Sequence, residues 1–65
     1  MSTLFKPAVM QGYSVRFNGF ADIDVVAIGE IEAVAAARHH LMTKRGVRKK
    51  ETLLSGRVTF VAALD

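Results

Sequence analysis

Few side chains in this sequence are of types that carry out chemistry, and the two histidines come first. His39 and His40 are adjacent in a stretch that is predicted to be helical, so their side chains point roughly 100° apart. They therefore do not converge on one metal ion, and neither has a histidine or carboxylate four residues away to complete a zinc site. We interpret both as exposed residues near the C-terminal end of a helix.

Two aspartates have a spacing that would suit acid–base or metal chemistry. Asp22 and Asp24 are two residues apart in a predicted strand, so both carboxylates lie on the same face. Paired carboxylates can transfer protons or bind a hard cation, although such a cation wants more oxygen ligands than two residues offer. Arg16 is expected across from them on the neighbouring strand, and an ion pair between the strands is the simpler interpretation.

Motifs for covalent catalysis are missing from the sequence. It contains no cysteine, no nucleophile elbow, no phosphate-binding glycine loop, and no serine, histidine and aspartate at a spacing that so small a fold could close. We therefore expect no catalytic residues, no cofactor and no metal. The protein is predicted not to be an enzyme.

Basic residues are the remaining candidates for function, and they gather in one part of the chain. Residues 1–37 carry two cations and four acids, a net charge of −2, whereas residues 38–65 carry seven cations and two acids, a net charge of +5. The candidate binding residues are Arg38, Lys44, Arg45, Arg48, Lys49 and Lys50. Such clusters bind polyanions, because each neutralised phosphate releases a condensed counterion. The alternative is a solvated turn that aids solubility and complements the helix dipole.

One predicted element positions most of these residues, an amphipathic helix between Gly29 and Gly46. Its alanines favour a helix, two glutamates lie in its first turn, and Gly46 suits the left-handed conformation that ends many helices. The side expected to face the core consists of Ile31, Val34, Ala35, Leu41 and Met42. Arg38 and Arg45 project from this same apolar side, and that unusual placement favours a function for both.

Before the helix, the sequence predicts a β-hairpin: YSVRF, Asn-Gly, then FADIDVVA. A two-residue loop would place Val15 opposite Asp22, an apolar residue beside an acidic one. A three-residue loop instead pairs odd positions with odd positions, which leaves the apolar residues of both strands on one face. We therefore predict the three-residue loop, with Gly19 in the left-handed conformation.

After the helix, residues 57–64 predict a strand. One face is expected to hold Val58, Phe60, Ala62 and Leu64, and the other Thr59 and Val61. Residues 47–54 are predicted to be either an exposed edge strand or a basic loop, and residues 1–12 either an edge strand or a flexible arm.

Together these elements predict one small α+β domain with the order ββαβ or ββαββ. Its antiparallel-rich sheet of three or four strands has one helix packed on one face. A chain of 65 residues buries only about 60% of its unfolded surface, so we expect a homodimer. The sequence has no apolar run near the ~18 residues of a membrane span and no convincing signal peptide, which predicts a cytoplasmic protein without membrane association.

The order of these segments resembles that of very small phage and mobile-element proteins, such as some type I anti-CRISPR proteins. The resemblance rests on Y-S-V-R-F, D-I-D-V-V-A and E-I-E-A-V-A-A-A-R within residues 13–64, and it is one of size and element order. It implies a protein partner, because those proteins cover a nucleic-acid-binding surface of a larger complex. In that role an acidic strip would mimic phosphate: Asp22, Asp24, Glu30 and Glu32.

Three functions therefore remain open from the sequence. The first is a binding module that docks on nucleic acid through the basic residues, with Phe17 or Phe20 at the hairpin tip as the only plausible exposed aromatic platform. The second is an inhibitor that blocks a larger bacterial protein complex. The third is a small oligomeric structural protein, in which Arg38 reaches an acid of a neighbouring subunit.

Overall fold

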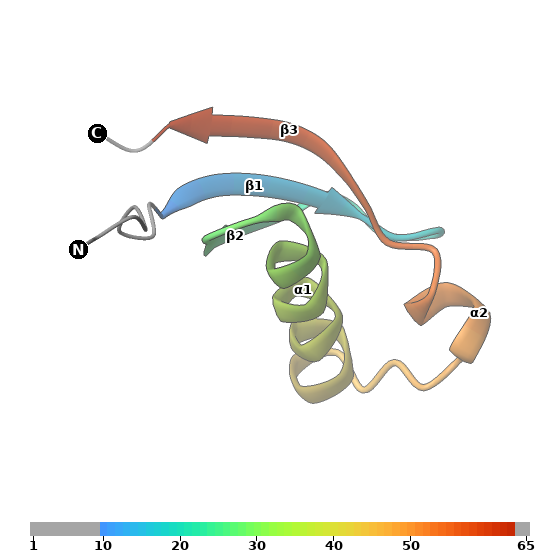
Figure 1. Ribbon diagram of the computed structural model, residues 1–65. Helices are drawn as coiled ribbons and strands as arrows, with labels where there is room; N and C mark the ends of the chain where they lie inside the picture. Colours follow the sequence, from blue (N-terminus) through green and yellow to red (C-terminus); the bar gives the residue numbers. More distant parts are fainter. Residues whose placement is uncertain (1–9, 64–65) are drawn as a thin grey trace.

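The computed structural model describes residues 10–63 and has an α+β fold (Figure 1). Its elements are β1 (Gln11–Arg16), β2 (Ile23–Ala27), α1 (Glu30–Lys44), α2 (Lys50–Leu53) and β3 (Arg57–Ala63). The strands form one antiparallel sheet in the order β2-β1-β3, and α1 packs against one face of it. The predicted order ββαβ is therefore confirmed.

Two predicted segments differ from the structure. The edge strand considered for residues 47–54 is wrong, because these residues form an irregular connection and then the single turn of α2. Residues 1–12 are predicted to be an edge strand or an arm, and residues 1–9 of this segment lie outside the described residues. Gln11 and Gly12 belong instead to β1, the central strand of the sheet.

The hairpin of β1 and β2 has the predicted pairing of odd with odd positions. Tyr13 pairs with Val25 and Val15 pairs with Ile23, which places the apolar side chains of both strands on the face toward α1. The strands end earlier than predicted, so the connection spans residues 17–22 rather than three residues. Phe17 is fully buried in the core, and the Phe20 backbone N–H donates to its carbonyl oxygen at 3.0 Å, so the chain begins to turn at this residue. Gly19 has the predicted left-handed conformation, with φ of 86°.

Strand β3 contains a β-bulge, and this makes the predicted division of its faces wrong. Val58 pairs with Val15, but the next residue of β1, Ser14, pairs with Phe60, so Thr59 is the additional residue. Beyond the bulge, Phe60 and Ala62 therefore lie on the face opposite to Val58. The Thr59 hydroxyl is 3.2 Å from the Ser14 carbonyl oxygen.

Helix α1 begins and ends as predicted but presents a different side to the core. Gly29 is its N-cap, and Gly46 has φ of 67° just after the last turn. The buried side consists of Ala33, Ala37 and Leu41, and its centre lies roughly 100° around the axis from the predicted side. Of the residues predicted to face the core, Leu41 is buried as expected and Val34 packs against the core in part. Ile31, predicted to face the core, is 82% exposed. Alanines allow the helix backbone to approach the sheet closely, and the larger apolar residues are left toward its margin.

The segment after α1 completes the core under the C-terminal half of the helix. The backbone N–H of Val47 donates to the Leu41 carbonyl oxygen at 3.0 Å, which folds the chain back beneath the helix end. Leu53 of α2 then enters the core. Gly56 follows, where an added Cβ would lie 2.5 Å from the Phe17 ring, so only glycine fits at this close approach.

Candidate polyanion-binding surface

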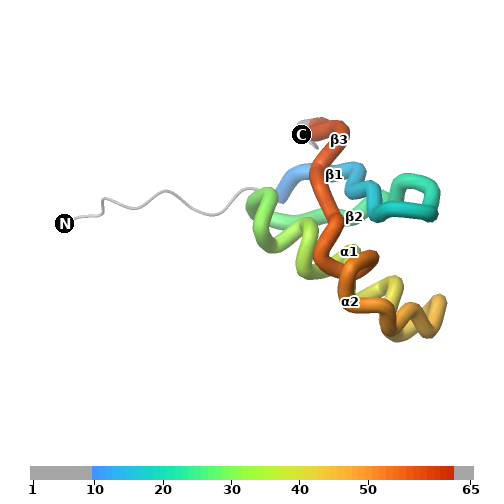
Figure 2. The backbone as a smooth tube through the Cα atoms, turned by 90° about the vertical axis from the view of Figure 1, so that its right-hand side faces the viewer, coloured from blue at the N-terminus to red at the C-terminus, as the bar shows by residue number. Residues whose placement is uncertain are grey.

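Five of the six predicted binding residues form one continuous stretch of exposed cations. We call this stretch the basic surface, and it consists of Lys44, Arg45, Arg48, Lys49 and Lys50. The residues lie in the last turn of α1, in the connection that follows, and at the start of α2. Figures 1 and 2 both place this region at the far end of α1 from β3.

The local sequence explains why these side chains face solvent. Helix α1 ends at Lys44, and the left-handed Gly46 reverses the chain without a hydrophobic residue at the turn. Val47 is the one apolar residue of the connection, and it packs on the core while its basic neighbours Arg48 and Lys49 stay exposed. A single apolar anchor thus holds the connection and turns its cations outward.

Arg38 is separate from the basic surface. Its side chain is half-buried, and its Nε donates a hydrogen bond of 2.8 Å to the backbone carbonyl oxygen of Leu53. This bond joins α1 to the C-terminal end of α2. Leu53 is itself buried, so the contact has a structural purpose, and the unusual position of Arg38 requires no ligand to explain it.

Arg45 is exposed and lies over the ring of Phe20, with its guanidinium carbon 5.6 Å from the ring centroid. Phe20 is half-buried against the core, and Phe17 is fully buried. Phe17 is therefore not the exposed aromatic platform considered from the sequence. Phe20 remains accessible in part, and the Arg45 contact brings the hairpin loop alongside the basic surface.

The charges of the basic surface have no acidic partner in the described part of the chain. The one ion pair found there joins Arg16 Nε to Asp22 Oδ1 at 2.6 Å, on the sheet. The nearest acid in sequence, Glu51, is exposed on α2 and forms no such pair with these cations. Five exposed positive charges within seven residues, without an acidic partner among the described residues, produce a local field that attracts a polyanion.

The two aspartates have the structural role that the sequence favoured. Asp22 accepts the bond from Arg16, and this bond is the main reason that the pKa of Asp22 lies below its ordinary value, against a smaller opposing effect of desolvation. The Thr59 hydroxyl, 3.0 Å from Asp22, acts in the same direction as Arg16. Asp24 accepts a hydrogen bond of 2.8 Å from the Ser14 hydroxyl. The predicted ion pair of Arg16 with an aspartate is confirmed, and Asp22 lies in the connection just before β2.

The histidines are exposed on α1, as predicted. Thr43 donates its hydroxyl to the backbone carbonyl oxygen of His39 at 2.9 Å, and this contact does not involve the imidazole. Among residues 10–63, histidine and acidic side chains do not come together in a group of three that could hold a metal ion.

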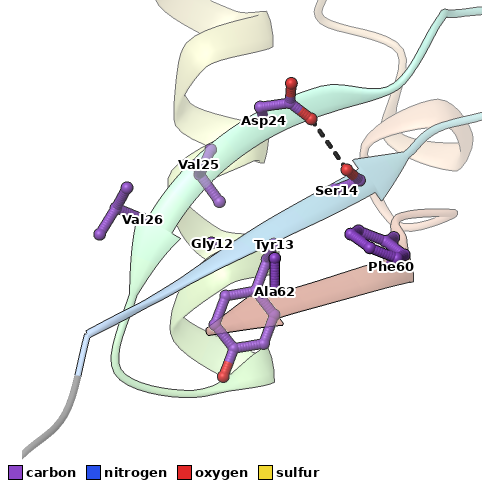
Figure 3. Close-up of a pocket in the computed structure, with 8 residues that line it drawn as sticks. All are labelled: Gly12, Tyr13, Ser14, Asp24, Val25, Val26, Phe60 and Ala62. Atoms are coloured by element: carbon purple, nitrogen blue, oxygen red, sulfur yellow. Dashed lines mark hydrogen bonds between the residues drawn. The ribbon is translucent and has the colours of Figure 1, made fainter. Parts of the chain in front are cut away.

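The face of the sheet opposite α1 carries a second feature, a shallow hollow of about 370 Å³ (Figure 3). Gly12 forms its floor between Val26 on one side and Ala62 on the other. At one end the ring of Phe60, which is 62% exposed, lies beside Ser14. The hollow is lined mostly by apolar groups and lacks a converging set of polar ones, so it has the character of a contact surface rather than of a catalytic site.

Comparison with models of protein families, with curated proteins and with solved structures gave no match to this chain. In the described residues, no helix is long and apolar enough to cross a membrane. The assignment of a function therefore rests on the geometry and charge of the basic surface.

Proposed function

We propose that this protein is a non-enzymatic binding module that docks on nucleic acid through the basic surface. The observation that carries the proposal is the set of five neighbouring exposed cations without an acidic partner among the described residues. The basic surface differs in this respect from Arg16, which is paired with Asp22 on the sheet. A cytoplasmic location, where nucleic acid is abundant, is part of this proposal.

The form of the surface suits a phosphate backbone better than base edges. Its cations lie on a helix end, an irregular connection and a single helical turn, and no long helix or ribbon projects there to enter a groove. Lysines and arginines that contact phosphates fix the position of a protein on nucleic acid but carry no sequence information. We therefore expect binding with little sequence preference.

The test is the salt dependence of binding to labelled DNA and RNA of mixed sequence, measured by fluorescence anisotropy. If all five cations contact phosphates of duplex DNA, the logarithm of the association constant should fall with the logarithm of salt concentration with a slope of about −4.5. Arg48→Gln should make this slope shallower by about 1. No binding at low salt, or an affinity independent of salt, would contradict the proposal.

A matched control separates the basic surface from net charge. Arg57→Gln also removes one exposed cation, but from the start of β3. It should leave the slope nearly unchanged, because a phosphate contact is local whereas net charge is a property of the whole chain. Equal effects of Arg48→Gln and Arg57→Gln would indicate general electrostatic attraction rather than a defined surface.

A second candidate is an inhibitor that binds a larger bacterial protein complex, as the resemblance to type I anti-CRISPR proteins implies. The exposed apolar side chains of Val26 and Phe60 around the hollow favour a protein contact on that face. Affinity capture from a bacterial lysate after nuclease digestion distinguishes the two functions. Capture of the same protein with and without nuclease, abolished by Phe60→Ser, would support the inhibitor.

A further inference from the structure

The two edges of the sheet differ in length and in charge. Strand β2 has five residues, includes Asp24, and follows Asp22 closely. Strand β3 has seven residues, and after Arg57 it carries no charge as far as Ala63. Charged side chains on an edge oppose pairing with another strand, so β2 is protected and β3 is not.

Strand β3 also exposes large apolar side chains on both of its faces. Phe60 is 62% exposed on the open face, and Val61 is 42% exposed although it lies on the face toward α1. Helix α1 packs mainly against β2 and makes fewer contacts with β1 and β3, and Val61 near the end of β3 stays exposed. Among the described residues the outer edge of β3 has no partner strand, and from Val58 to Ala63 it carries no charge. Another strand paired there would satisfy its outer backbone groups and cover the exposed apolar side chains.

We infer that two copies of this chain pair antiparallel through their β3 strands, about a twofold axis at Val61. This arrangement joins two three-stranded sheets into one sheet of six strands. Val61 lies opposite its counterpart, and Phe60 lies opposite Ala62 of the second copy. Residues directly opposite each other share a face, so this register keeps Phe60 and Ala62 together on the open face and the two Val61 side chains together on the face toward α1.

The chemistry of the strand favours a second copy over an unrelated partner. In a twofold contact every interaction occurs twice, so the strand must be complementary to itself. The segment from Val58 to Ala63 meets this condition, because it brings neither like charges nor a proline to the contact. In both views the basic surface lies at the end of α1 that is far from β3 (Figures 1 and 2). Two chains of net charge +3 can therefore pair through β3 without bringing these cations together.

Cross-linking of single cysteines tests the contact, since the sequence contains no cysteine of its own. Val61→Cys should give a covalent dimer with a short bis-maleimide, because opposite Cβ atoms in an antiparallel pair are about 5 Å apart. Val26→Cys is the matched control, since it is an exposed valine on the other edge strand, and it should remain monomeric. Equal cross-linking of the two variants, or none with Val61→Cys, would overturn the inference.

Sedimentation equilibrium supplies a second measurement on the unmodified chain. The protein should show a reversible dimer at high micromolar concentration, and Val61→Lys should shift it to monomer without loss of its circular dichroism signal. A monomer at all concentrations, or a Val61→Lys variant that still dimerises, would contradict the pairing. The outcome is independent of the proposed function, because Val61→Lys leaves all five cations of the basic surface in place.

Discussion

The two halves of α1 each carry a large apolar side chain, but in very different environments. The N-terminal half carries Ile31, the most exposed of its large apolar side chains, and the C-terminal half carries Leu41, which is fully buried. The difference has two causes: Ile31 lies away from the buried side of the helix, and the chain that follows the helix covers only its C-terminal half. Residues 47–53 fold back beneath the C-terminal half and cover Leu41, whereas no described segment covers Ile31. How deeply a helical residue is buried thus depends on segments elsewhere in the chain as well as on its position around the helix.

The largest effect on stability should come from replacing Leu41 by alanine, compared with the same replacement at Ile31. Leu41→Ala should lower the free energy of unfolding by about 2–5 kcal/mol, because it removes a buried side chain and leaves a cavity. Ile31→Ala should leave stability of the monomer nearly unchanged, since its side chain is 82% exposed. Urea denaturation at low protein concentration measures both. A similar loss for the two variants would show that the halves do not differ as described.

The close approach of α1 to the sheet gives the next prediction. Ala33→Leu should lower the free energy of unfolding by about 1–3 kcal/mol, because the added atoms enter a filled space between helix and sheet. Ala36→Leu is the control, because the same change occurs at an exposed position of the same helix. Its effect should be near zero, since leucine and alanine have similar helix propensities. Equal effects would contradict the observed rotation of the helix.

A smaller effect is expected at Arg38, where the C-terminal half of α1 is joined to α2. Arg38→Met keeps most of the aliphatic stem but loses the hydrogen bond to the Leu53 carbonyl, which should cost about 1 kcal/mol in unfolding free energy. Arg48→Met should cost almost nothing in stability. The salt slope of nucleic-acid binding should respond in the opposite way, with a change for Arg48→Met and little for Arg38→Met. The reverse result would place Arg38 in the binding surface.

The smallest effect concerns the ion pair on the sheet and depends on pH. The lowered pKa of Asp22 means that its bond with Arg16 stabilises the fold above the ordinary carboxyl pKa of 3.8. This contribution is lost as the pH falls from that value through the lowered one. Asp22→Asn should therefore be slightly less stable than the natural chain at neutral pH and equal to it in strong acid. Arg16→Gln should show the same pH dependence in denaturation curves.

Local signals in the sequence predicted much of the fold. Gly19 and Gly46 have the left-handed conformations expected of them, and the parity of the hairpin follows from the alternation of apolar and acidic residues. The helix limits follow from Gly29 and the turn after Lys44. These features depend on residues close together in the chain, which is why a pattern can reveal them.

Features set by contacts between distant residues were not predictable in this way. The bulge at Thr59 depends on how β3 meets β1, and it alone moves Phe60 to the open face. The rotation of α1 arises because alanines pack closest to the sheet, whereas a hydrophobicity pattern gives most weight to isoleucine and methionine. The contact of Arg38 with Leu53 joins residues fifteen positions apart. Five predicted cations are exposed together, and their role in binding stays a prediction.

The attachment of α2 has a consequence for the dynamics of the molecule. This single turn is held chiefly by one buried leucine and by the bond from Arg38, so its local opening should cost far less free energy than global unfolding. Amide hydrogen exchange of Leu53 and Leu54 should accordingly be faster than that of residues in β1. Because α2 carries Lys50 and follows Lys49, a polyanion bound to the basic surface would slow this exchange by holding α2 in place.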